Sequence, residues 1–140
     1  MPQSVKIKTH KPGSSYSESH FFILSKGNNS GKPLISPCPN CFVLLAESES
    51  ERELLYWLCF GLWQGGCFRI CLCGSVIPFI HLRDVKNLLA VACEKVADKK
   101  EAFAKAVEVL RCCIAQEEKI AHQLKLMQEA KKLIMYKLLQ

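Results

Sequence analysis

The segment SESERELLYWLCFGLWQGG (residues 48–66) organises the chain. It begins with two overlapping S-x-x-E capping boxes, in which a serine and a glutamate three residues later satisfy free N–H groups at a helix start. The ten residues after Glu53 are apolar almost all round a helix, which indicates a buried helix. Gly65 and Gly66 favour its termination. The sequence therefore predicts a buried helix over residues 49–63.

Three short runs before this helix predict strands. VKIKT (residues 5–9) alternates, which places Lys6 and Lys8 on a solvent-exposed face. HFFIL (residues 20–24) and FVLLA (residues 42–46) are continuously apolar and predict more buried strands. Strands before the helix thus begin a small sheet against which the helix packs.

The run FRICLC (residues 68–73) predicts a return strand after the helix, and GSVIPFIHLRD follows it. Pro78 has no N–H to give to a ladder, so residues 76–80 are expected to form an edge strand or a buried extended segment. Asp84 is placed to cap an amphipathic helix over residues 84–96. We expect a structural hinge between a head and a C-terminal arm, made of Gly74, Ser75, Pro78 and Asp84.

The chain from residue 101 to residue 139 has no proline or glycine and is rich in helix formers. Apolar residues recur along it at spacings of three and four, with polar interruptions at Glu117 and Lys131. A lone helix of this kind is marginal in water, so we expect it to pair with a second copy or with another protein, or to fold back as a hairpin. The residues expected to pair are Val107, Leu110, Ile114, Leu124, Met127, Ile134 and Leu138.

These elements predict an α+β fold, with a small mixed β-sheet, packed helices and a long coiled-coil-like C-terminal helix. A length of 140 residues and an apolar content of 49% suit one domain with a real core. We expect an α+β domain over residues 1–98 and a helical arm over residues 99–140.

Composition narrows the classes of protein. No apolar leader follows Met1, and nine cysteines is an odd number in a chain of this length, so reduced thiols and a cytoplasmic location are expected. Residues 54–82 carry a single charge, Arg69, but Gly65 and Gly66 divide them, and neither half is long enough for a spanning helix. No membrane association is expected. No Ser-His-Asp or paired-acid arrangement is recognisable, so we expect no enzyme activity and no cofactor.

The order of parts resembles half of a specificity subunit from type I restriction-modification systems. The resemblance rests on ESERELLYWLCFGLW, on GSVIPFIHLRDVKNLLA, where a Gly-Ser pair and a proline precede a D-V-K-N-L helix start, and on QEEKIA at residues 116–121. It covers roughly residues 40–140. It implies a target-recognition domain with a long helix that reads DNA, catalyses nothing and positions partner subunits. This chain departs from the family in having one recognition domain and one arm. It also looks similar to small stand-alone proteins of unknown function.

The net charge of +6, with a basic excess at both ends of the chain, is compatible with a double-stranded DNA partner. In this hypothesis lysines contact phosphates and the asparagines of a polar loop reach base edges. The expected DNA-binding residues are Lys6, Lys8, His10, Lys11, Lys26, Asn28, Asn29 and Lys32. The alternatives are an interaction or scaffold protein that binds no DNA, and a small zinc-stabilised module using Cys38, Cys41, Cys71 and Cys73.

Overall fold

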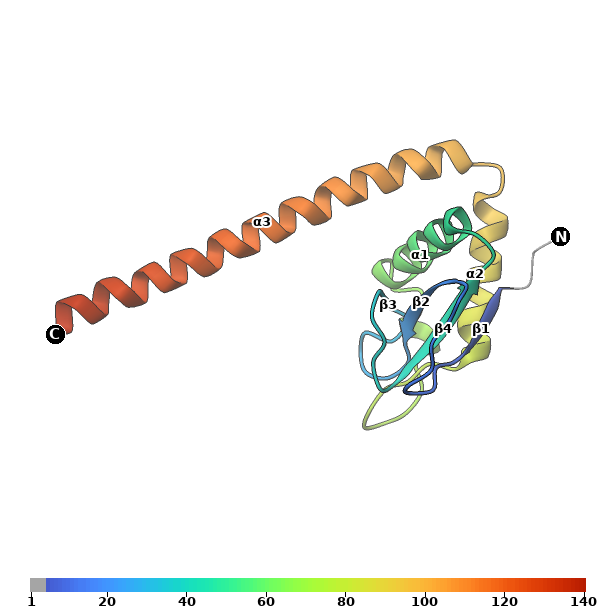
Figure 1. Ribbon diagram of the computed structural model, residues 1–140, viewed down its shortest axis with the longest axis horizontal. Coiled ribbons are helices and arrows are strands. Elements are labelled where there is room, and N and C mark those ends of the chain that lie inside the picture. The colour runs from blue at the N-terminus through green and yellow to red at the C-terminus, as the bar shows by residue number, and fades with distance from the viewer. Residues whose placement is uncertain (1–4) are drawn as a thin grey trace. The chain divides into compact units, whose positions relative to one another are not determined.

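The computed structural model describes residues 5–140 and divides into two compact units, residues 1–98 and residues 99–140. We call the described part of the first unit the head and the second unit the arm. The head combines one sheet with two α-helices and a short 3-10 helix, and the arm holds one long helix, so the α+β class is confirmed (Figure 1).

The sheet has four strands in the order β1-β4-β2-β3. The strands are β1 (Lys6–Thr9), β2 (Ser19–Leu24), β3 (Pro33–Leu34) and β4 (Cys41–Ala46). Every neighbouring pair is antiparallel, so the expected mixed sheet is wrong. The reason is that β1 and β2 run in the same direction but never pair, because β4 lies between them.

The two faces of the sheet are covered differently. Helices α1 (Glu49–Gln64) and α2 (Leu82–Val96) pack on the inner face, where Phe21 meets the ring of Tyr56 edge to face. Because side chains alternate along a strand, Phe22 points the other way. It forms an outer-face cluster with Cys41 and Val43, and half-buried side chains from loops and strands pack against that cluster.

Helix α1 begins as expected. The Ser48 hydroxyl accepts a hydrogen bond of 3.1 Å from the Glu51 N–H, and the Glu51 carboxylate accepts one of 2.6 Å from the Glu47 N–H. The first of the two predicted capping boxes is therefore present in part, because Ser48 caps the Glu51 N–H while the Glu51 carboxylate binds the N–H of Glu47 and not that of Ser48. The helix ends at Gln64, and Gly66 follows with a φ of +77°. Its buried side is narrower than expected and comprises Leu55, Trp57, Leu58 and Cys59.

The prediction of a strand over residues 68–73 is wrong. Residues Arg69–Cys71 form a 3-10 helix, η1, whose N–H groups bond three residues back along the chain. Those bonds consume donors that a sheet ladder would need. Phe68 is buried with 1% exposure and Ile70 is 87% exposed, so the apolar run splits between core and surface.

The segment over residues 76–80 is not an edge strand. Val76 is 89% exposed at the tip of a loop closed by a bridge between Cys73 and Phe79. Pro78 contributes its carbonyl, which accepts a 2.7 Å hydrogen bond from the Gly27 N–H.

The predicted hinge also needs correction. Gly74 has a φ of +92° and, with Ser75 and Pro78, shapes this loop within the head. Helix α2 starts at Leu82 with His81 as its N-cap, so Asp84 lies in the first turn and is not the cap. All four hinge residues belong to the head, because the boundary between the units follows Asp98.

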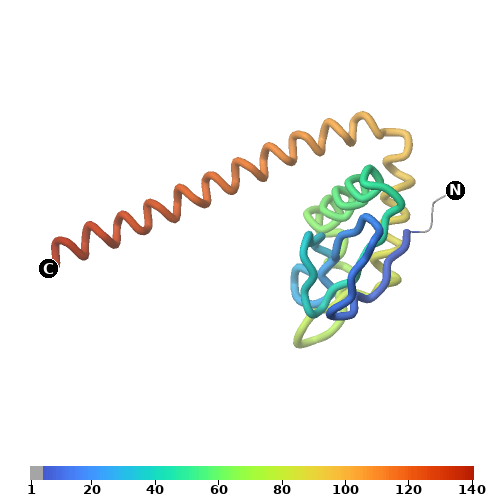
Figure 2. The backbone as a smooth tube through the Cα atoms, viewed as in Figure 1, coloured from blue at the N-terminus to red at the C-terminus, as the bar shows by residue number. Residues whose placement is uncertain are grey.

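The arm is the expected long C-terminal helix. Helix α3 (Lys100–Leu139) has 40 residues and runs without interruption in the backbone trace (Figure 2). At 1.5 Å per residue it is about 60 Å long. In the part of the chain that the structure describes, no helix has the length and apolar character needed to cross a membrane.

Candidate functional site

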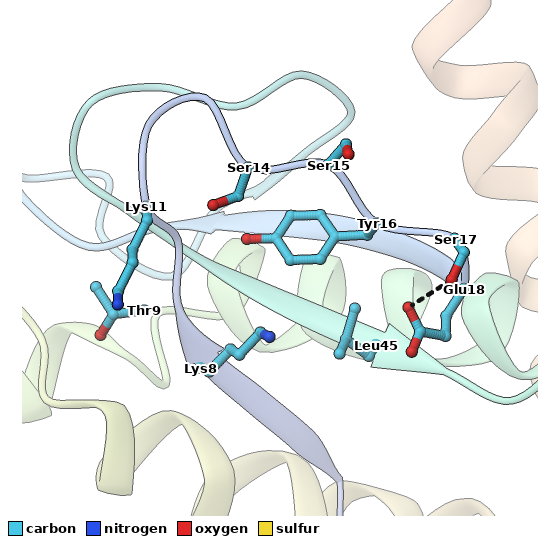
Figure 3. A pocket seen from close by; sticks show the side chains of 9 residues that line it. All are labelled: Lys8, Thr9, Lys11, Ser14, Ser15, Tyr16, Ser17, Glu18 and Leu45. Carbon is cyan, nitrogen blue, oxygen red and sulfur yellow. Dashed lines mark hydrogen bonds between the residues drawn. The ribbon is translucent and has the colours of Figure 1, made fainter.

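A pocket of about 430 Å³ lies on the outer side of the sheet, beside the chain that joins β1 to β2 (Figure 3). That connection spans residues 10–18 and crosses from one end of the sheet to the other, because β1 and β2 run in the same direction. Polar side chains dominate the lining, which comprises Lys8, Thr9, Lys11, Ser14, Ser15, Tyr16, Ser17, Glu18 and Leu45. The pocket therefore presents mainly polar and charged side chains, with two lysines and one glutamate among them.

An aromatic cluster lies next to this pocket and shares Tyr16 with its lining. His10 is buried, and its Nδ1 lies 2.8 Å from the Tyr16 hydroxyl. Phe22 makes T-shaped contacts with His10 and His20, with ring centroids 5.1 and 5.4 Å apart. The Lys8 ammonium lies 5.3 Å from the centroid of the Tyr16 ring, where it is attracted by the negative face of the ring. Tyr16 thus contacts both the buried His10 and the exposed Lys8.

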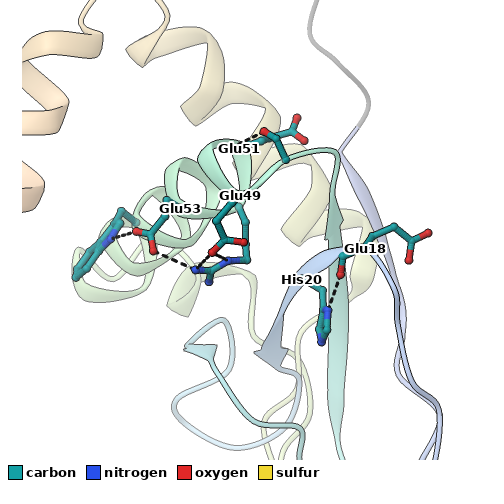
Figure 4. A network of polar contacts seen from close by, with 8 residues as sticks. Glu18, His20, Glu49, Glu51 and Glu53 are labelled. Carbon is teal, nitrogen blue, oxygen red and sulfur yellow. Dashed lines mark hydrogen bonds and ion pairs between the residues drawn. The ribbon is translucent and has the colours of Figure 1, made fainter.

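A second polar network surrounds the start of α1 (Figure 4). Arg52 donates to Glu49 at 2.7 Å and to Glu53 at 3.0 Å, and the Trp57 indole N–H donates to Glu53 at 3.2 Å. The hydrogen bond from Arg52 lowers the pKa of the Glu49 carboxyl. These bonds hold side chains of one helix together, so they serve the helix and do not form a paired-acid site.

The residues expected to bind DNA fall into separate places. Lys6, Lys8 and Lys11 are exposed, and the two strand lysines share the outer face of β1. His10 is 7% exposed and bonded to Tyr16, so it is not at the surface as the hypothesis required. The other four residues, which belong to the chain between β2 and β3, are Lys26, Asn28, Asn29 and Lys32.

In the loop between β2 and β3, Lys32 points away from the outer-face lysines. Lys26, Asn28 and Asn29 are exposed. The Lys32 ammonium lies 5.2 Å from the centroid of the Trp63 ring on α1, and α1 covers the inner face. The structure therefore does not gather the eight residues into one basic surface.

The four proposed zinc ligands are not brought together. Among residues 5–140, no group of three or more His, Cys, Asp or Glu side chains is arranged to hold a metal ion. The failure of the predicted strand over residues 68–73 removes the geometry that would have aimed Cys71 and Cys73 at one site. The thiol of Cys41 donates to the Cys38 carbonyl at 3.2 Å, and burial raises its pKa.

The residues expected to pair along the arm differ in exposure. Val107 is 8% exposed, and Leu110 and Ile114 are half-buried. The other four are 55 to 73% exposed, namely Leu124, Met127, Ile134 and Leu138. Further apolar side chains, including Ile120 at 61%, are also exposed along α3. The arm thus carries an apolar surface that water contacts over most of its length.

Comparison with known proteins places the chain in a family. A family model described as a family of unknown function (DUF6943) matches residues 7–137. The chain belongs to DUF6943. The match to DUF6943 extends from β1 to the last turns of α3, so it covers both the head and the arm. No curated protein and no solved structure matched the chain.

Sequence reasoning missed Tyr16, which packs against the outer-face cluster of this DUF6943 chain. Tyr16 falls in a stretch rich in Ser, Gly and Pro, which indicates only a loop. The available signal was the pair of histidines, His10 and His20, on either side of it. Their rings lie 5.7 and 5.3 Å from that of Tyr16, because the loop crosses the face on which both histidines lie.

Proposed function

We propose that this protein is a non-catalytic assembly module, in which the arm pairs with the arm of a second copy and so joins two heads. The observation that carries the proposal is the exposure of apolar side chains along a 40-residue helix. An isolated helix gains little stability in water, and a surface of this kind is normally covered by a partner. Pairing of two arms buries it without any further component.

The proposal is tested by sizing two matched variants. Leu124 and Leu126 are 55% and 49% exposed, and they lie two residues apart on α3. Because each residue turns a helix by about 100°, they point to nearly opposite sides. Leu124 belongs to the stripe with three- and four-residue spacing, and Leu126 does not.

We expect the unchanged chain to be a dimer by light scattering. Leu124→Glu places a charge in the pairing surface and should weaken dimerisation at least about tenfold. Leu126→Glu adds the same charge outside that surface and should leave the dimer intact. A monomeric unchanged chain, or equal effects of the two variants, would contradict the proposal.

DNA binding by the head is a second candidate, and the resemblance to type I specificity subunits is its origin. The specific observation in its favour is that Lys6 and Lys8 are exposed on the outer face of β1, with Lys11 exposed just beyond the strand. Three lysines within six residues of one segment suit contact with a phosphate backbone. The placement of Lys32 over Trp63 removes Lys32 from the candidate surface, and we take the three lysines of this segment as its centre.

Electrophoretic mobility shift with random duplex DNA at several salt concentrations tests this candidate. Three phosphate contacts predict a log-log salt slope of about −2.7. Replacing both Lys6 and Lys8 with Gln should flatten the slope, whereas Lys32→Gln should leave it unchanged. The absence of any shift at low salt would eliminate DNA binding by the head.

A further inference from the structure

The spacing of the apolar stripe on α3 reads the same from either end. From Phe103 the stripe advances by four, three, four and three residues to Glu117. Counted backward from Leu138, it also steps by four, three, four and three residues, and reaches Leu124. The midpoint of this palindrome falls between Ile120 and Ala121. A stripe of this form superimposes on itself when a second copy is turned end for end.

We propose that two arms pair antiparallel, with the two-fold axis between Ile120 and Ala121. This inference rests on the proposed function and specifies the orientation and register of the pair. Each layer joins two residues whose numbers add to 241, so the register is fixed along the whole helix. The layers are Phe103 with Leu138, Val107 with Ile134, Leu110 with Lys131, Ile114 with Met127, Glu117 with Leu124, and Ile120 with Ala121.

The two polar positions of the stripe favour this orientation. A parallel pair in register would place Glu117 against Glu117 and Lys131 against Lys131, which brings like charges together in two layers. In the antiparallel register each of these residues faces a leucine of the other copy. A long charged side chain beside a leucine can extend its head group to solvent, which like-charged residues facing each other resist.

The charges of the two halves of α3 also favour antiparallel pairing. Residues 121–139 contain four lysines and one glutamate, whereas residues 100–120 contain four basic residues and four glutamates. Parallel pairing sets the two basic halves side by side. Antiparallel pairing sets each basic half against a neutral half, which reduces the repulsion.

Exposure is consistent with pairing in the middle of the stripe. Ile120, Leu124 and Met127 are 61, 55 and 66% exposed. Val107 is already buried, so the layers from Leu110 to Lys131 carry the inference. These layers span about 30 Å at 1.5 Å per residue, which is three heptads.

Cysteine cross-linking of the full chain tests the orientation. The background replaces the exposed Cys112 and Cys113 with Ser, so that they do not react. Ile114→Cys and Met127→Cys are then made separately in this background. In the proposed pair these two positions face each other across the copies, while each lies 13 residues from its own equivalent, or about 20 Å.

We expect a short bismaleimide to join an Ile114→Cys chain to a Met127→Cys chain after the two are mixed, and to join neither variant to itself. The background alone, and a mixture of Ile114→Cys with the off-stripe Leu126→Cys, should remain unlinked. A link within either variant alone would establish parallel arms and overturn the inference while leaving dimerisation standing. A light-scattering dimer without the mixed link would overturn the register, and a monomer would overturn the proposed function itself.

Discussion

Tyr16 lies over the outer face of the sheet and supplies the hydrogen bond of a buried histidine. His10 is 7% exposed, and its Nδ1 lies 2.8 Å from the Tyr16 hydroxyl. A buried polar atom that loses its partner retains the cost of leaving water. The bond therefore ties Tyr16 to the buried start of the residue 10–18 connection.

Tyr16→Phe keeps the ring contacts and removes only the hydroxyl. We expect it to lower the free energy of unfolding by about 1–2 kcal/mol, because Nδ1 of His10 is left without this partner. Urea unfolding followed by circular dichroism measures the change. Tyr136→Phe, at a tyrosine that is 63% exposed on the arm, is the control and should be neutral. Equal stability of all three chains would show that the hydroxyl bond contributes nothing.

Gly31 is required for a different reason from Gly27, although both lie in one loop. Their φ angles are +97° and +96°, a region that L side chains rarely adopt. A Cβ at Gly31 would overlap the ring of the buried Phe68, whereas a Cβ at Gly27 meets nothing within 4 Å. The pair therefore separates backbone strain from packing.

Replacing each glycine with alanine separates the two costs. Gly27→Ala should lower the free energy of unfolding by about 1–2 kcal/mol through strain alone. Gly31→Ala should lose a further 1–3 kcal/mol, roughly, because Phe68 must move. Urea unfolding of both variants gives the difference. If both variants lost the same free energy of unfolding, the Phe68 ring would be able to move away from a Cβ at position 31 at no cost, and the packing argument would be wrong.

At the level of elements, α1 was predicted well because its signals are local. A serine, a glutamate three residues later and two terminal glycines act within one or two turns of the helix. The second predicted box did not form, since the Glu53 carboxylate accepts from Arg52 and Trp57. Ser48, which accepts from the Glu51 N–H, is the cap.

Ser48 and Ser50, the serines of the two predicted capping boxes, give a matched test of the cap. Ser48→Ala removes the acceptor for the Glu51 N–H and should reduce the free energy of unfolding by about 1 kcal/mol. Ser50→Ala, inside the exposed first turn, should change it by less than about 0.5 kcal/mol. Thermal or urea unfolding distinguishes them. A larger loss of stability for Ser50→Ala would show that Ser50, and not Ser48, caps the helix.

The elements that sequence reasoning missed depend on distant partners. FRICLC has the composition of a strand, yet Phe68 is buried over Gly31, a residue far away in the sequence. No periodicity within residues 68–73 reveals that space. The prediction of a mixed sheet was wrong for a similar reason. The position of β4 between β1 and β2 depends on strand order, which no local sequence pattern indicates.

At the scale of the whole molecule, the head contains the core. Among residues 5–140, every buried hydrophobic residue except Val107 lies before residue 99. Of the residues that line the pocket, the sequence singled out only Lys8 and Lys11, since the burial of His10 and the position of Tyr16 follow from the long crossing of residues 10–18. The arm was predicted because helix formers and spacing suffice for a helix without long-range contacts.

A chain that ends at Asp98 should therefore fold by itself. We expect it to unfold cooperatively in urea and to be monomeric by light scattering, because it keeps the sheet with α1 and α2 and lacks the arm. Far-ultraviolet circular dichroism and a one-dimensional proton spectrum check the fold. A non-cooperative transition would mean that the arm is needed to complete the core.

The two outermost strands of the sheet limit how heads can associate. Strand β3 has two residues and begins with Pro33, which lacks an N–H, and β1 is four residues long and carries two exposed lysines. Short edges with proline or lysine resist the addition of foreign strands and the growth of fibres. Concentrated protein should for this reason stop at a defined oligomer and not continue into open-ended β aggregates.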